Sequence, residues 1–167
     1  MGGRITQSAE QLRPDAKFND KVLSKFINCI MTDGRKTSAT RCVYDAFDVI
    51  EKKLEKDKDN PNAPKDALEL FHMAIDNVKP PVEVRSKRIG GANYQVPLQV
   101  NRKRQQSLAF RWIITSARGE RGRPMADRLA DELYNAARGE GKAMATREQT
   151  IRMAEANRAF AHFAGGR

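Results

Sequence analysis

Apolar residues recur every three or four positions over most of the chain, which is the spacing of helices with one buried side. The first such run begins after Asn19, a predicted cap, and its apolar residues are Val22, Leu23, Phe26, Ile27, Ile30 and Met31. The second run follows Ser38, also a predicted cap, and its apolar residues are Ala39, Cys42, Val43, Ala46, Phe47, Ile50 and Leu54. Because a short link at Asp33-Gly34 joins them, we expect the two helices to pack together.

Three further helices are predicted, and prolines mark the bounds of two of them. The third carries Pro64 in its first turn and ends at Pro80-Pro81, because the residue before a proline disfavours helical geometry. A fourth includes Leu108 and Ile113, and Pro124 opens a fifth. The sequence therefore predicts a largely helical body.

A sixth and last helix is predicted from a capping pattern. Thr146 and Gln149 have the Thr-x-x-Gln form of a capping box, which places the helix from Arg147 to about His162. Its apolar side is thin compared with those of the earlier helices. It carries Arg147, Arg152 and Arg158.

Residues 82–101 have a different period, in which apolar and polar residues alternate as in a half-buried strand. Two such arms meet at Gly90-Gly91, where positive φ angles cost little and a hairpin can turn. Pro97 cannot donate to a strand ladder, so it is expected on an outward edge. The predicted fold is mainly α, a six-helix bundle with a protruding two-stranded β-ribbon between the third and fourth helices.

The chain of 167 residues is expected to form a single domain over residues 1–167. Within it we predict an N-terminal arm over residues 1–18, laid on a partner or loose, the ribbon over 82–101 and a C-terminal tail over 164–167. No apolar run is long enough for a membrane span, and no signal-peptide core is present.

Positive charge is concentrated in one part of the sequence. The formal net charge is +10, and residues 79–123 alone contain eleven Lys or Arg against Glu83 and Glu120, a net of +9. A surface that only faces solvent would carry both positive and negative side chains, so we interpret this segment as a binding face for a polyanion. Arg35 and Lys36, at the turn between the first two helices, are equally consistent with phosphate binding and with solvation.

The residues that usually carry chemistry do not gather into a recognisable site. No nucleophile motif, phosphate-binding loop or metal-ligand cluster is present, and His72 and His162 stand far apart. Cys29 and Cys42 fall on apolar helical faces and are expected to be buried in a reducing compartment. We therefore expect no enzyme activity, no cofactor, no metal and no small-molecule substrate.

Arginines occur on several predicted elements, namely a turn, the ribbon, the fourth helix and the last helix. A DNA-binding regulator more often concentrates its contacts on one recognition helix, although a basic ribbon also enters a major groove. Structured RNA surrounds its partners and offers irregular grooves. RNA binding is the favoured hypothesis, and a DNA-binding transcriptional regulator is the alternative.

Three blocks of this sequence resemble the bacterial type of the small-subunit ribosomal protein seven family. They are NDKVLSKFINCIMTDGRKT (Asn19 to Thr37), VKPPVEVRSKRIGGANYQVPLQV (Val78 to Val100) and RMAEANRAFAHF (Arg152 to Phe163). The resemblance implies a structural constituent of the cytoplasmic ribosome. It also implies binding to the 3′ major domain of small-subunit ribosomal RNA (rRNA) and nucleation of assembly of the subunit head.

The same resemblance implies roles for particular residues. The rRNA contacts are expected from Arg35, Lys36, Arg102, Lys103, Arg104, Arg111, Arg118, Arg147, Arg152 and Arg158. The ribbon is expected near the exit-site (E-site) transfer RNA and the messenger RNA, through Arg85, Lys87, Arg88, Gly90, Gly91 and Tyr94. The Tyr94 ring either stacks on a base or packs on the ribbon's own apolar face. Trp112 is expected in the core, and neighbouring head proteins are further expected partners.

Overall fold

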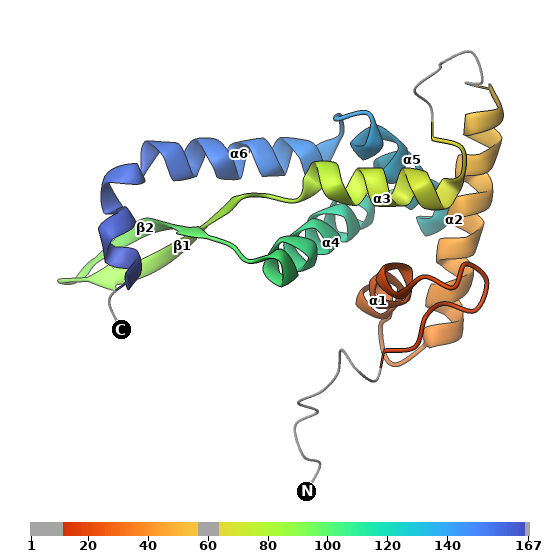
Figure 1. Cartoon of the computed structure of the whole chain (residues 1–167), viewed down its shortest axis with the longest axis horizontal. Helices are drawn as coiled ribbons and strands as arrows, with labels where there is room; N and C mark the ends of the chain where they lie inside the picture. Colours follow the sequence, from red (N-terminus) through yellow and green to blue (C-terminus); the bar gives the residue numbers. More distant parts are fainter. Residues whose placement is uncertain (1–11, 57–63, 166–167) are drawn as a thin grey trace, which may run out of the picture.

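The computed structural model describes residues 12–56 and 64–165 (Figure 1). The described part contains six α-helices, one two-stranded sheet and a final 3-10 helix. Their bounds are α1 Lys21–Ile30, α2 Lys36–Lys56, α3 Ala67–Val78, β1 Val82–Ile89, β2 Ala92–Gln99, α4 Arg102–Gly119, α5 Met125–Ala137, α6 Lys142–Ala156 and η1 Arg158–Gly165. The predicted fold, mainly helical with a ribbon between the third and fourth helices, is confirmed.

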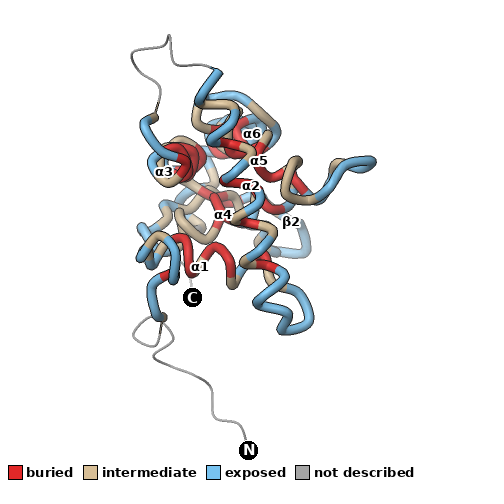
Figure 2. Tube along the Cα trace, turned by 90° about the vertical axis from the view of Figure 1, so that its right-hand side faces the viewer, coloured by how far each residue is buried: buried red, intermediate tan, exposed pale blue. Residues whose placement is uncertain are grey.

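Helices α1 to α5, with the first turn of α6, enclose the hydrophobic core, which Figure 2 shows as the buried inner sides of the helices. At its centre four phenylalanine rings, each 0–1% exposed, come from four different helices. The Phe26 ring lies 5.1 Å from both Phe71 and Phe110, and Phe47 lies 5.8 Å from Phe71. Trp112 is half-buried and packs against this core, as predicted.

Three predicted helix starts were wrong by one to three residues. Asp20, and not Asn19, caps α1, since its side chain accepts a hydrogen bond of 2.6 Å from the Leu23 amide. Asn19 instead takes a positive φ of 51° just before the helix. Helix α2 begins at Lys36, so Ser38 lies inside it. Pro64 likewise precedes α3, which starts at Ala67.

The last helix differs more from the prediction. Helix α6 begins at Lys142, and Thr146 lies within it, where its hydroxyl donates to the Lys142 carbonyl at 2.9 Å. The capping group comes from α5: a carboxylate oxygen of buried Glu132 accepts from the Ala143 amide at 2.7 Å. Burial raises the pKa of Glu132, and this hydrogen bond opposes the rise. The cap is therefore a tertiary contact, which a local pattern cannot reveal.

Gly141 allows this contact by its backbone geometry. It has a φ of 98°, and a Cβ there would lie 3.2 Å from the Glu132 carboxylate oxygen. Glycine is therefore the residue that suits the sharp turn from α5 into α6 at this point. At its other end α6 stops at Ala156, and η1 replaces the predicted continuation to His162.

The ribbon has the register expected from its sequence. Strands β1 and β2 are antiparallel, with Val82 opposite Gln99 and Ile89 opposite Ala92. Gly90 and Gly91 form the two-residue turn, with φ angles of 56° and 89°. Positive φ at both central residues is the hairpin geometry that matches strand twist.

The ribbon extends beyond the α1–α5 body, but it does not stand alone. Helix α6 runs alongside it, and η1 packs on β2 (Figure 1). The Tyr94 ring lies 5.0 Å from Phe160 and 5.9 Å from Phe163, and the Lys87 ammonium donates to the Phe163 carbonyl at 2.9 Å. Since an isolated two-stranded ribbon is barely stable in water, the C-terminal segment supplies the support it needs.

The expected N-terminal arm is only partly described. Residues 1–11 lie outside the described part, as does the loop at 57–63. Residues 12–18 do not form a loose arm, because they pack onto α2. The Phe18 ring lies 5.2 Å from Phe47, and the Tyr44 hydroxyl donates to the Asp15 carboxylate at 2.9 Å. In the expected tail, η1 includes residues 164–165, and 166–167 lie outside the described part.

Candidate RNA interface

An ion-paired triad joins the base of the ribbon to α4. Glu83 on β1 is 6% exposed and lies between two arginines. The Arg104 Nε atom donates to its carboxylate at 2.8 Å, and Arg85 pairs with its other oxygen. Burial alone would raise the pKa of Glu83, but the hydrogen bonds from Arg104 and Arg85 outweigh it and hold the pKa below its usual range. Arg85 pairs with Glu83 within β1, whereas Arg104, a predicted rRNA contact, also fixes the ribbon to the body.

The first turn of α4 presents cations where a helix usually carries anions. The Asn101 side chain caps the helix by accepting from the Arg104 amide at 2.9 Å. Arg102 and Lys103 follow, both exposed, and the turn has no acidic residue. Cations near the positive end of a helix dipole are unfavourable by about 0.3–1 kcal/mol each. A bound phosphate would reverse this effect, because it is attracted by the cations and by the free amides.

The basic side of α4 continues to the far end of the helix. Arg104, Arg111 and Arg118 are spaced seven apart and share one face. This face begins at the Arg104–Glu83 pair and ends at Arg118, whose guanidinium donates to the Ile30 carbonyl at 2.8 Å. The contact places the end of α4 beside the end of α1.

The turn that follows α1 adds two exposed cations, Arg35 and Lys36. We call the exposed cations from the first turn of α4 to this turn the basic stripe; its members are Arg102, Lys103, Arg111, Arg118, Arg35 and Lys36. Helix α4, with 18 residues, is roughly 27 Å long, enough to follow several phosphates. The structure thus brings the cations of α4 and those of the α1–α2 turn, which are far apart in the sequence, onto one surface.

Carboxylates neutralise a different set of cations. Within the described residues, Arg123 pairs with Glu120 and Asp131, Lys142 pairs with Glu120, and Lys79 pairs with Asp76. The members of the basic stripe have no carboxylate partner in residues 12–56 and 64–165. Within residues 79–123, α4 therefore carries four of the cations without a carboxylate partner, and the α1–α2 turn, which lies outside that segment, adds Arg35 and Lys36 to them.

Three predicted arginines lie away from the stripe. The Arg147 Nε atom donates to the Lys79 carbonyl at 3.3 Å, which ties α6 to the link between α3 and β1. Arg152 lies on α6, with a side chain 79% exposed and a contact of 3.4 Å to Glu148. Arg158 begins η1 and lines a hollow beside the ribbon. Their roles remain predictions.

The ribbon residues divide into two groups. Arg88, Gly90 and Gly91 are exposed at or beside the tip. Tyr94 is half-buried, and its ring packs on η1, a contact that neither sequence-based alternative included. Its expected closeness to RNA stays a prediction.

Two exposed arginines were missed in the sequence. Arg41 on α2 lines a hollow of about 530 Å³ together with Lys36, Thr37, Thr40, Tyr44 and Asp45, and so lies beside the Lys36 end of the stripe. Arg121 is exposed in the link between α4 and α5. The spacing of five residues from Lys36 to Arg41 does not follow the helical period, so it gave no signal.

One of the expectations about buried groups was tested by the structure. Cys29 is exposed and Cys42 half-buried, so the prediction that both are buried was wrong. Partial desolvation by the surrounding protein still raises the pKa of each thiol. In the described ranges no three His, Cys, Asp or Glu side chains gather as metal ligands would. No helix among those ranges combines the length and apolar character of a membrane span.

Comparison with known proteins identifies the family. Residues 3–158 match the family model described as ribosomal protein S7p/S5e. The chain is 53% identical to small ribosomal subunit protein uS7 of Rhodopirellula baltica, over 97% of this chain and 99% of the relative. It is 50% identical to the protein of the same name from Methylocella silvestris and 48% identical to that from Ruegeria pomeroyi, each over 98% of this chain and 99% of the relative.

These matches confirm the resemblance on which the sequence-based expectations rested. They also confirm a place in the cytoplasmic ribosome of bacteria and a role in translation, with no enzymatic activity. The chain belongs to the ribosomal protein S7p/S5e family and is a structural protein of the small ribosomal subunit.

Proposed function

We propose that this protein binds the 3′ major domain of small-subunit rRNA and nucleates assembly of the subunit head. In this proposal the basic stripe contacts rRNA phosphates. Arg104, Arg147, Arg152 and Arg158 add contacts around it, and other head proteins are its neighbours. The ribbon tip extends towards the E-site transfer RNA and the messenger RNA. The chain acts as a single RNA-binding domain.

The observation that carries the proposal is the absence of carboxylate partners along the basic stripe within the described residues. Ion pairs satisfy the cations around α5, whereas Arg102, Lys103 and Arg111 face solvent. Cations that lie close together without carboxylate partners repel one another. Bound phosphates neutralise this charge, and the counterions released from the RNA further favour binding.

The arrangement of the cations supports RNA over duplex DNA. The stripe passes over α4, the α1–α2 turn and the start of α2, and the ribbon tip lies beyond the body (Figure 1). These positions are not the single groove-bound helix of a typical DNA regulator. They suit a folded RNA, which presents phosphates in several directions.

A competition experiment tests the proposal. Labelled 3′ major domain RNA is bound to the full chain at moderate salt and is then challenged with duplex DNA at equal nucleotide concentration. We expect unlabelled domain RNA to displace the probe and duplex DNA to leave it bound. Displacement by DNA as effective as that by RNA would favour the DNA-regulator alternative and refute the proposal.

A further inference from the structure

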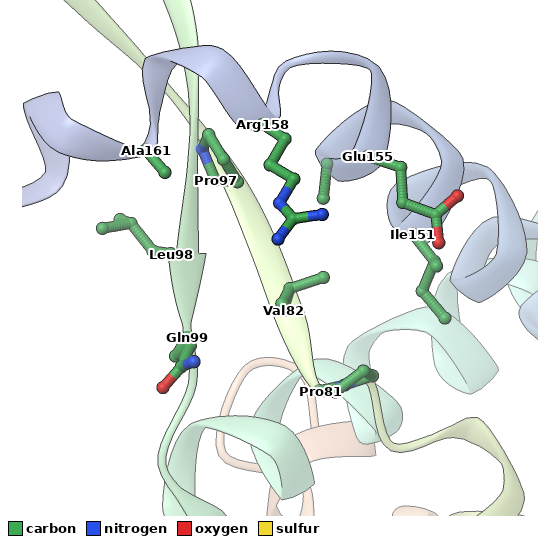
Figure 3. Close-up of a pocket in the computed structure, with 10 residues that line it drawn as sticks. Pro81, Val82, Pro97, Leu98, Gln99, Ile151, Glu155, Arg158 and Ala161 are labelled. Carbon is green, nitrogen blue, oxygen red and sulfur yellow. The ribbon is translucent and has the colours of Figure 1, made fainter.

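A hollow of about 430 Å³ lies between the ribbon and the C-terminal segment (Figure 3). One wall comes from the ribbon, with Pro81, Val82 and Pro97, and the other from α6 and η1, with Ile151 and Ala161. Small-molecule and cofactor sites have volumes of roughly 300–1,000 Å³. The hollow is therefore large enough for a flat ring of nucleobase size.

Polar groups in the lining contrast with its apolar walls. Arg158, Glu155 and Gln99 also line the hollow, and Figure 3 shows the Arg158 guanidinium extending over it towards Val82. In the described residues neither Arg158 nor Glu155 has an ion pair. The hollow thus offers a donor-only group, an acceptor-only group and an amide that does both.

This combination matches the chemistry of an unstacked nucleobase. A base has two apolar faces and an edge of donors and acceptors, and proteins recognise single-stranded RNA by covering the faces and bonding the edge. Arginine, glutamine and carboxylate side chains are the groups that pair with base edges.

The surrounding charge favours RNA over a protein side chain as the occupant. Arg152 lies on α6 before the hollow, and Arg88 lies near the ribbon tip; both are exposed. The chain as a whole carries a net charge of +10, which attracts a polyanion and repels basic proteins.

We propose that the hollow between the ribbon and α6–η1 binds one unstacked nucleobase of an RNA partner. The walls cover the faces of the base, and Arg158, whose guanidinium extends over the hollow, bonds its edge. This subsite rests on the proposed RNA-binding function but is separate from the basic stripe, because it contacts a base where the stripe contacts phosphates.

Neutral nucleosides test the subsite without the phosphate. Amide chemical shifts of the full chain are measured with adenosine or cytidine, with inorganic phosphate, and with N-acetyl-leucinamide as a mimic of a protein side chain. We expect saturable shifts from a nucleoside at amides of residues 81–82, 98–99 and 151–161. Equal shifts from phosphate would show an anion contact only, shifts from N-acetyl-leucinamide alone would show a protein site, and no shifts would show an unused hollow. Each of these three results overturns the proposal.

A filling variant extends the test to RNA. Ala161→Trp places an indole at the hollow, and Ala159→Trp is the matched control, since Ala159 is exposed in the same 3-10 helix and does not line the hollow. Loss of one base contact should weaken RNA binding about tenfold in Ala161→Trp, with an unchanged salt dependence because no phosphate contact is lost. Arg158→Met should weaken binding without filling the space.

The outcomes separate the subsite from the proposed function. If Ala161→Trp binds the domain RNA as tightly as Ala159→Trp, the subsite is refuted while RNA binding stands. If the unaltered protein does not bind the domain RNA, the proposed function itself fails.

Discussion

Replacing Arg102, Lys103 and Arg111 together with alanine should weaken binding to the 3′ major domain RNA on the order of a hundredfold at about 0.1 M salt. Each lost phosphate contact removes about 0.7–0.9 from the slope of log affinity against log salt, so the slope should become shallower by about 2 to 3. Arg104 is left in place because it bonds Glu83 and holds the ribbon. The measurement is a salt titration of RNA binding.

The matched control removes the same charge from another surface. Lys52, Lys56 and Lys65 are exposed near the junction of α2 and α3, at the opposite end of α2 from the stripe. Their triple alanine variant should keep most of the affinity and the original slope. Equal losses in both variants would mean that net charge, and not the stripe, determines binding.

Phe71→Ala should destabilise the fold by about 3–5 kcal/mol, the usual effect of deleting a buried aromatic ring. The Phe71 ring contacts Phe26 and Phe47 and is 0% exposed at the centre of the core. Three helices meet at this ring, so its removal leaves a cavity that no single side chain can fill. Urea unfolding followed by circular dichroism measures the change.

Phe160→Ala is the control for this prediction. Phe160 is half-buried and contacts the ribbon at Tyr94, away from the α1–α5 core. Its loss should change the unfolding midpoint far less than the loss of Phe71. A similar loss of stability in the two variants would show that the ribbon and its C-terminal support belong to the same cooperative unit as the core.

The spacing of apolar residues predicted which segments are helices and which are strands, because each helix or strand buries one side. The apolar residues of α1, α2, α3 and α5 recur at helical spacing, and the alternation in 82–101 marked the ribbon. Gly90-Gly91 fixed the turn, since both residues need positive φ. These signals are local, and the sequence contains them in full.

Contacts between distant residues were beyond local patterns. Glu132 caps α6 from α5, and the helix starts at Lys142, five residues before the predicted start at Arg147. The packing of η1 on the ribbon likewise depends on Tyr94, Phe160 and Phe163 meeting across more than 60 residues of chain.

The sequence predicted which segment of the chain carries the positive charge. It did not predict which of these cations form the exposed surface without carboxylate partners. The excess of Lys and Arg in residues 79–123 was plain from the sequence. Which of these cations pair with carboxylates depends on the fold: Glu83 engages Arg85 and Arg104, and Arg123 pairs with Glu120 and Asp131. The hydrogen bond from Arg118 to Ile30, which joins α4 to the α1–α2 turn, is equally non-local.

Lysine reactivity in the complex tests most directly whether RNA lies on the basic stripe. The full chain is acetylated with and without the 3′ major domain RNA, and the modified lysines are measured by mass spectrometry. Lys36 and Lys103 are both exposed and should lose reactivity in the complex, while Lys52 and Lys65 should react as in the free protein. Protection of Lys52 and Lys65 with Lys36 and Lys103 still reactive would contradict this account.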